Sequence, residues 1–315
     1  MKIAIFGAAG AIGRAVLPTL IERGHEVRLV GRSREKLEAM SAGRAEIVLA
    51  DIEDPAAARI AADGADAVLF SVGLPYHESA RYPKITSVAL EAAKASGVRE
   101  FLLISTVYPY GLAQTPLVAE THPRDPHTRK GRNRNLQLEA VMAAHDPRGM
   151  RTTAVILPDF YGPTADYSVV KEILDAAASG KTANVLGPID RPHEYVFIPD
   201  VAPVIADLFD RPELFGEIYN FAGAGTINTR DFIAEVERVS GSSIKTLVAN
   251  KTMLRLLGIG IPMMRELVEM NYLQTEPLIL DDAKLRAALP SVHKTSYAAG
   301  IAQTLAAKGI GLAHV

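Results

Sequence analysis

The chain has 315 residues, and 48% of them are hydrophobic, which is enough apolar material for a folded core. Its 34 basic and 36 acidic residues nearly cancel, which argues against a general nucleic-acid binder because such a protein needs a basic surface. The absence of cysteine excludes disulfides, thiolate nucleophiles and cysteine-ligated metals. No apolar run approaches the ~20 residues of a membrane span, and the first run is too short for a signal peptide, so we expect a cytoplasmic protein that binds no membrane.

Strands and helices alternate through the first half of the chain. Apolar runs predict buried strands at 2–6, 26–30, 46–49, 66–71, 100–105 and 152–157. Helices are expected between them, over about 11–23, 34–41, 55–64, 83–95 and 131–145. Ser33 is expected to cap the second helix, and Asp54 with Pro55 to start the third. This alternation predicts an α/β fold with a doubly wound parallel sheet of the Rossmann type.

The second half is less regular and predicts a smaller, mostly helical lobe. Helices are expected over about 166–179, over 201–209 with Asp200 as its cap, from a cap at Thr229 to Gly241, and near 296–308. Residues 216–221 resemble a strand that returns to the sheet. We therefore assign 1–163, with 190–222, to a cofactor-binding domain, and 164–189 with 223–315 to a substrate-binding lobe.

A glycine-rich turn follows the first strand. "FGAAGAIG" places Gly7, Gly10 and Gly13 between a strand and a helix, where glycines allow a tight turn, a close approach of pyrophosphate and close helix packing. This context predicts a dinucleotide site whose turn also includes Ala9, Ala11 and Ile12. The Gly-x-x-Gly-x-x-Gly spacing resembles that of the short-chain dehydrogenase/reductase superfamily.

The end of the second strand bears on the choice of cofactor. An acidic residue there would hold the ribose hydroxyls of NAD, but the chain has Arg32, with Arg34 and Lys36 close by. Because arginine can grip a 2′-phosphate with two hydrogen bonds, we expect NADP(H), with NAD(H) as the alternative. The resemblance further implies an adenine contact by Asp51 and Ile52, and a loop under the cofactor formed by Ser71, Val72 and Gly73.

Several later segments extend the resemblance over nearly all 315 residues. They are "LLISTVYPYG", "AETHPRDP", "LPDFYGP", "YVFIPDVAPVI" and "EIYNFAG". Together they resemble extended or atypical short-chain dehydrogenases/reductases of the NAD-dependent epimerase/dehydratase type. The resemblance implies that Ser105 and Pro158 contact the cofactor, that Tyr76, Tyr108, Asp159 and His193 line the substrate, and that the protein forms a homodimer.

The family's reaction needs a phenol that transfers a proton, a lysine beside it and a hydroxyl that polarises the substrate oxygen. Thr106 falls on the hydroxyl position. In "KGRNR", however, Lys130 stands where the family has its tyrosine, and Arg134 where it has its lysine. We expect Arg134 to anchor the nicotinamide ribose, and Lys130 to lie against the cofactor.

Three interpretations stay open. In the first, which we favour, Lys130 is itself the acid/base, because a nearby guanidinium and a cationic nicotinamide would make its ammonium lose a proton more readily. In the second, another group supplies the proton, and the candidates are Tyr108, Tyr110, Tyr161, Asp159, His122, His127 and His193. In the third, the protein binds NADP(H) as a redox sensor without hydride transfer. A non-redox lyase or isomerase on the same fold is a further alternative.

The basic run 128–134 begins a predicted helix, although a helix N-terminus disfavours cations. We therefore expect an anionic ligand there, either the cofactor or an acidic substrate. The eight histidines have no spacing typical of metal ligands, so no metal is expected. The resulting prediction is an NADP(H)-dependent oxidoreductase or epimerase-like enzyme that acts on a small carbonyl or hydroxyl substrate, with Thr106, Lys130, Arg134 and Tyr161 as candidate catalytic residues.

Overall fold

The computed structural model describes residues 1–310, apart from the side chains of Leu257, Pro262 and Met263. Within this part of the chain, seven parallel strands form one sheet in the order β10-β6-β5-β4-β1-β2-β3. They are β1 (Lys2–Phe6), β2 (Glu26–Gly31), β3 (Glu46–Leu49), β4 (Ala67–Phe70), β5 (Glu100–Thr106), β6 (Arg151–Leu157) and β10 (Ile218–Asn220). The order reverses between β1 and β4, which is the switch point where open α/β sheets bind ligands.

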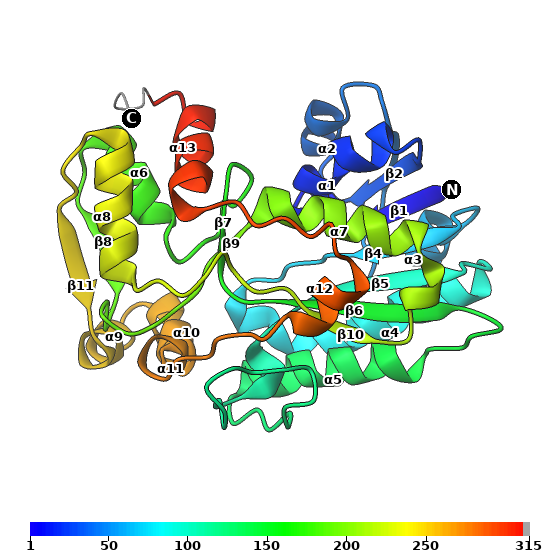
Figure 1. The fold of residues 1–315 in the computed structure, drawn as a ribbon. Coiled ribbons are helices and arrows are strands. Elements are labelled where there is room, and N and C mark those ends of the chain that lie inside the picture. Colours follow the sequence, from blue (N-terminus) through cyan, green and yellow to red (C-terminus); the bar gives the residue numbers. More distant parts are fainter. Residues whose placement is uncertain (311–315) are drawn as a thin grey trace.

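Helices cover both faces of the sheet (Figure 1). One face packs against α1 (Ala11–Glu22), α2 (Arg34–Ser41) and α7 (Ile198–Asp210). The other packs against α3 (Pro55–Ala62), α4 (Tyr82–Ala95) and α5 (Arg129–Ala143). The predicted doubly wound parallel sheet is confirmed. None of the described helices is both long and apolar enough to cross a membrane.

A lobe with its own hydrophobic core lies beyond the carboxyl ends of β5 and β6 (Figure 1). It contains β7 (Phe160–Tyr161), α6 (Lys171–Ser179), β8 (Ala183–Leu186), β9 (Val196–Phe197), α8 (Thr229–Ser240), β11 (Thr246–Ala249), α9 (Lys251–Leu257), α10 (Pro262–Met270), α11 (Tyr272–Thr275) and α13 (Tyr297–Ala307). Residues 1–310 also include α12 (Ala283–Ala288) and three 3₁₀ turns, η1 (Tyr76–Arg81), η2 (Tyr108–Tyr110) and η3 (Pro212–Leu214). Residues 311–315 of the predicted lobe lie outside the described residues.

Two predicted helix caps are wrong. The side chain of Asn228, not Thr229, accepts the Asp231 N–H at 2.7 Å and caps α8. Asp200 lies inside the first turn of α7, where its carboxylate accepts hydrogen bonds from the Thr295 N–H and hydroxyl, each at 2.7 Å. For α8 the preceding residue takes the cap, whereas α7 begins at Ile198, earlier than predicted, and has no side-chain cap. The helix expected over 166–179 begins only at residue 171.

A buried carboxylate joins the lobe to the sheet. Glu194 accepts the Gly223 N–H at 2.9 Å and the Leu280 N–H at 2.8 Å, so one side chain links three segments that are distant in sequence. Burial raises its pKa to about 7, although the two N–H groups oppose this rise by stabilising the charged form. The junction between sheet and lobe therefore contains a group that titrates near neutral pH.

Candidate functional site

The glycine-rich turn has the geometry that a dinucleotide site requires. Gly7 has a φ of +85°, and a Cβ there would lie 2.9 Å from the Cα of Val72. A Cβ on Gly13 would overlap the carbonyl oxygen of Ala8, so only glycine lets α1 pack this closely on the turn. Helix α1 starts after Gly10 without a side-chain cap. Its first N–H groups are therefore available to an anion such as a pyrophosphate.

The two arginines after β2 are in different situations. Arg34 pairs with Glu38 at 3.3 Å along α2. Arg32 is exposed at the end of the strand and makes no side-chain hydrogen bond among residues 1–310. Ser33 caps α2 by accepting the Lys36 N–H, as predicted. An exposed, unengaged guanidinium beside the glycine-rich turn suits a 2′-phosphate.

The remaining predicted cofactor residues follow the carboxyl ends of successive strands, on the edge of the sheet that holds the glycine-rich turn. They are Asp51 and Ile52 after β3, Ser71, Val72 and Gly73 after β4, Ser105 at the end of β5 and Pro158 after β6. Ala9, Ala11 and Ile12 belong to the turn and to the start of α1. The Ser105 hydroxyl is buried and finds no partner among the described residues, so it can still bond a ligand.

Lys130 lies in a buried ion-pair network. Its side chain is 1% exposed and its Nζ donates to Glu266 and to Glu269, the latter at 2.6 Å. The Lys130 backbone N–H also donates to Glu269, at 3.0 Å. Burial alone would raise the pKa of both glutamates, but hydrogen bonds from Lys130 and its charge outweigh this effect and hold each pKa below its usual value.

The other cations of the basic run also have partners within the chain. Arg129 pairs with Glu266 at 3.2 Å, and Arg132 donates to the His127 carbonyl at 2.8 Å. Arg134 donates to the Ile104 carbonyl at 3.2 Å and stacks 4.4 Å from the Tyr82 ring centre. The anions that the run was expected to attract include carboxylates of α10. A ligand is therefore not needed to explain the placement of these cations.

A second group of polar side chains lies at the ends of β5 and β6. The hydroxyls of Tyr76 and Tyr108 share a hydrogen bond of 3.4 Å, and the Tyr108 N–H donates to Thr106 Oγ1 at 3.3 Å. His193 Nε2 lies 3.0 Å from Asp159 Oδ2. Since a carboxylate only accepts, this ring nitrogen donates the proton of the bond.

The phenols of this group, and Tyr272 of α11, have raised pKa values. Burial raises the pKa of Tyr108 well above its usual value, and the charge of Asp159 adds to the shift. Burial and then Asp159 also raise the pKa of Tyr76 and of Tyr272. The Tyr272 hydroxyl is buried without a partner among the described residues. These phenols stay protonated near neutral pH and serve as hydrogen-bond donors.

We call these linked residues the polar cluster. Its members are Tyr76, Tyr108, Lys130, Asp159, His193, Glu266, Glu269 and Tyr272. The cluster joins the predicted substrate-lining residues to Lys130, whose Nζ lies 5.5 Å from the Tyr76 ring centre. Sequence reasoning missed Glu266, Glu269 and Tyr272. The acidic pair at i, i+3 in "RELVEM" marks one helix face, but nothing in the sequence indicates which partner that face meets.

Three other predicted proton donors lie away from the polar cluster or are already engaged. Tyr161 is fully buried in the core of the lobe, its hydroxyl has no partner among the described residues, and burial raises its pKa strongly. Tyr110 donates to Asn220 Oδ1 at 2.8 Å. The His122 ring accepts the Gln114 N–H and contacts the Pro123 carbonyl. None of the three is placed to meet a substrate beside Thr106.

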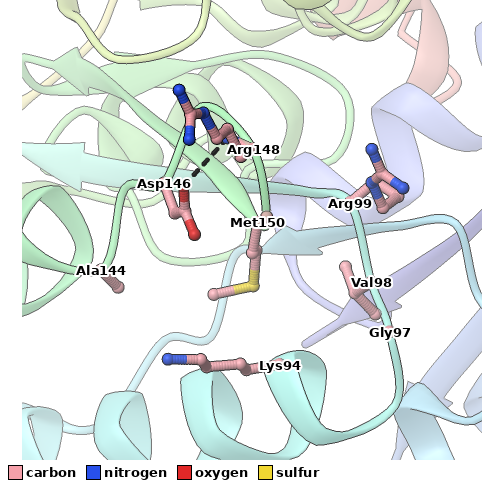
Figure 2. Close-up of a pocket in the computed structure, with 9 residues that line it drawn as sticks. Lys94, Gly97, Val98, Arg99, Ala144, Asp146, Arg148 and Met150 are labelled. Carbon is pink, nitrogen blue, oxygen red and sulfur yellow. Dashed lines mark hydrogen bonds between the residues drawn. The ribbon is translucent and has the colours of Figure 1, made fainter.

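A surface hollow lies elsewhere on the protein. Figure 2 shows Lys94, Arg99 and Arg148 around it, with Asp146 and Met150. Its lining segments lead into β5 and β6, so it lies at the amino ends of these strands, opposite the glycine-rich turn. Parallel α/β sheets bind ligands at the carboxyl ends of their strands, so this hollow is not the candidate active site. Among the described residues, no three potential ligands gather to hold a metal ion.

Comparison with known proteins agrees with the cofactor geometry. Residues 7–128 match a family model described as NAD(P)H-binding. A protein of Bacillus subtilis that is named an uncharacterized sugar epimerase is 32% identical over 116 residues, which cover 34% of this chain and 53% of the relative. A probable dTDP-4,6-dihydroxy-2-methyloxan-3-one 4-ketoreductase of Streptomyces antibioticus is 28% identical over 242 residues, or 76% of this chain and 77% of the relative. The chain thus spans about half of the first relative and three quarters of the second.

Solved structures share the whole fold. The UDP-glucose 4-epimerase of Thermotoga maritima, solved with UDP-glucose, has a TM-score of 0.80 at 20% identity, over 98% of this chain and 99% of that one. A dTDP-glucose 4,6-dehydratase of Streptomyces venezuelae, solved with NAD and TYD, has a TM-score of 0.79 at 19% identity, over 98% and 97%. At these identities the likeness establishes the fold.

Proposed function

We propose that this chain, which carries an NAD(P)-binding Rossmann domain and has the fold of the extended short-chain epimerases and dehydratases, is an NADP(H)-dependent oxidoreductase or epimerase-like enzyme for a small carbonyl or hydroxyl substrate. One observation carries the proposal: the polar cluster adjoins Thr106, at the sheet edge that also holds the glycine-rich turn. A protein that only senses the cofactor has no need of an Asp–His pair and linked phenols at that edge.

Different residues of the chain would bind different parts of the cofactor and the substrate. The turn from Gly7 to Gly13 and the start of α1 hold the pyrophosphate, and Arg32 holds the 2′-phosphate. The bound nicotinamide supplies or accepts the hydride. The Thr106 hydroxyl polarises the substrate oxygen.

The geometry favours a structural role for Lys130 over proton transfer. Its ammonium is buried and held by two carboxylates, whereas the acid/base interpretation depended on cationic surroundings. Burial keeps the phenols of Tyr76 and Tyr108 protonated. Histidine is the side chain best suited to exchange protons near neutral pH, and Asp159 fixes the orientation of the His193 ring. We therefore assign the proton exchange to His193.

Cofactor titration tests the cofactor half of the proposal. We expect NADPH to bind at least about tenfold tighter than NADH, which corresponds to about 1.4 kcal/mol. Arg32→Ala should remove this preference, because it removes the partner of the 2′-phosphate. Arg34→Ala is the matched control and should keep the preference, because Arg34 already pairs with Glu38. A wild-type preference for NADH would overturn the assignment of NADP(H).

A substrate screen tests the catalytic half. Carbonyl compounds are offered with NADPH, and the loss of NADPH absorbance is followed. General acid–base catalysis typically contributes about 10²–10⁴-fold to the rate. A fall in turnover of at least about 100-fold in His193→Gln, with NADPH affinity unchanged, therefore supports the proton-transfer role. If no carbonyl compound oxidises NADPH while the two cofactor forms change binding to a protein partner, the redox-sensor alternative is correct.

A further inference from the structure

The basic run at the start of α5 does not offer free positive charge to a substrate. Lys130 and Arg129 face Glu266 and Glu269, and Arg134 is held by a backbone carbonyl and the Tyr82 ring. Lys130 is fully buried within these contacts. Within the polar cluster as the structure describes it, every cation is thus already neutralised or engaged.

Negative charge, in contrast, exceeds positive charge in the polar cluster. Of its three carboxylates, Glu266 and Glu269 pair with Lys130, and Glu266 pairs also with Arg129 at the exposed rim, so the excess of negative charge lies on Asp159. Asp159 has only the neutral or charged imidazole of His193 as its partner among the described residues. A phosphate would meet the negative charge of Asp159, which has no lysine or arginine partner among the described residues, and like charges in a poorly hydrated site repel strongly.

Hydrogen-bonding groups point to the chemistry that the cluster can accept. The Tyr272 side chain is 7% exposed, and its hydroxyl has no partner among the described residues. Burial raises the pKa of this hydroxyl, so it stays protonated and can donate a hydrogen bond. Tyr76 and Tyr108 add two hydroxyls, and the face of the Tyr76 ring already carries a cation at 5.5 Å. Such donors, acceptors and aromatic faces suit hydroxyl groups or an ammonium.

We infer that the polar cluster selects an uncharged or cationic substrate and rejects a phosphate-bearing one, with Asp159 as the main specificity-determining residue. This inference rests on the proposed function and narrows its substrate class. It sets the chain apart from the epimerase of the same fold that was solved with UDP-glucose, since a nucleotide sugar brings a diphosphate. Fold likeness at 20% identity leaves room for such a difference.

The test uses three probes with the same three-carbon ketone skeleton and different charge. Dihydroxyacetone is neutral, aminoacetone is cationic and dihydroxyacetone phosphate is anionic. Binding to the NADP⁺-saturated protein is measured by saturation-transfer NMR, which does not require turnover, and kcat/KM is measured from NADPH oxidation where turnover occurs. We expect the phosphate to bind at least about tenfold more weakly than either other probe. Equal or tighter binding of the phosphate, or no binding of any probe, would overturn the inference.

Two variants test whether the polar cluster causes the discrimination against phosphate. Asp159→Asn keeps the size of the side chain and should reduce the discrimination against phosphate at least about threefold. Glu139→Gln, on the exposed face of α5, makes the same change of charge away from the cluster and should leave discrimination unchanged. Unchanged discrimination in Asp159→Asn contradicts the inference. NADPH titration separates the two claims, because a chain that fails to bind NADPH contradicts the proposed function itself.

Discussion

Removal of the Lys130 side chain distinguishes a structural lysine from a catalytic one. In Lys130→Met, Glu266 and Glu269 lose their common partner while both stay largely buried, at 18% and 22% side-chain exposure. Breaking a buried ion pair by removing one member costs about 3–5 kcal/mol, and here the uncompensated charge is mainly that of Glu269, because Glu266 keeps Arg129. We expect a loss of this size in the free energy of unfolding. The triple variant Lys130→Met, Glu266→Gln, Glu269→Gln should recover most of it.

The assay combines urea unfolding with turnover. Lys130→Arg is the informative control, because arginine keeps the positive charge but cannot give up its proton. If Lys130 only holds α10 in place, this variant keeps turnover within about tenfold of the wild type. The reasoning is refuted if Lys130→Met unfolds at the same urea concentration as the wild type while both variants lose turnover by more than about 100-fold, the range expected for a lost acid/base.

Three further predictions follow from single sites. Gly13→Val should weaken NADPH binding at least about tenfold in a fluorescence titration and destabilise the protein by about 1–3 kcal/mol, because its side chain overlaps the Ala8 carbonyl; wild-type affinity would contradict this. Tyr161→Phe should leave turnover unchanged and alter the free energy of unfolding by less than about 1 kcal/mol, because the hydroxyl it removes is buried and has no partner among the described residues. A loss of turnover would instead indicate that Tyr161 is catalytic. Burial raises the pKa of Glu194 from near 4.5 in the unfolded chain to about 7 in the folded protein. Between these pH values the folded state therefore binds more protons than the unfolded state, and the free energy of unfolding falls as the pH rises. The stability of the wild type relative to Glu194→Gln should therefore drop by about 3 kcal/mol between pH ~4.5 and pH ~8, and a difference independent of pH would contradict the shift.

The sequence predicts the first half of the fold well, because its signals are local. The second helix (residues 34–41) and the third strand (residues 46–49) have the predicted bounds. Ser33 and Asp54 cap their helices by accepting nearby N–H groups. The glycine-rich turn is equally local, since its close contacts are with Ala8 and with the loop after β4. Short-range patterns suffice for such features.

The partners of Lys130 could not be predicted in this way. Glu266 and Glu269 lie 136 and 139 residues further along the chain, on a helix that the sequence analysis did not identify. The prediction that the basic run binds an external anion rested on the cost of cations at a helix N-terminus. That argument identified the need for an anion correctly but could not identify its source, because long-range pairing depends on how the lobe folds back.

At the start of α5, Glu269 accepts hydrogen bonds both from an unpaired backbone N–H and from the Lys130 side chain. Its Oε1 accepts the Lys130 backbone N–H, one of the unpaired donors of the first turn, and its Oε2 accepts from Lys130 Nζ. One carboxylate thus stabilises the positive end of the helix and neutralises a cation that this end disfavours. A lysine engaged in this way holds α10 against the domain that binds the cofactor. The function proposed above accordingly assigns the proton exchange to His193, whose ring is oriented by its hydrogen bond to Asp159.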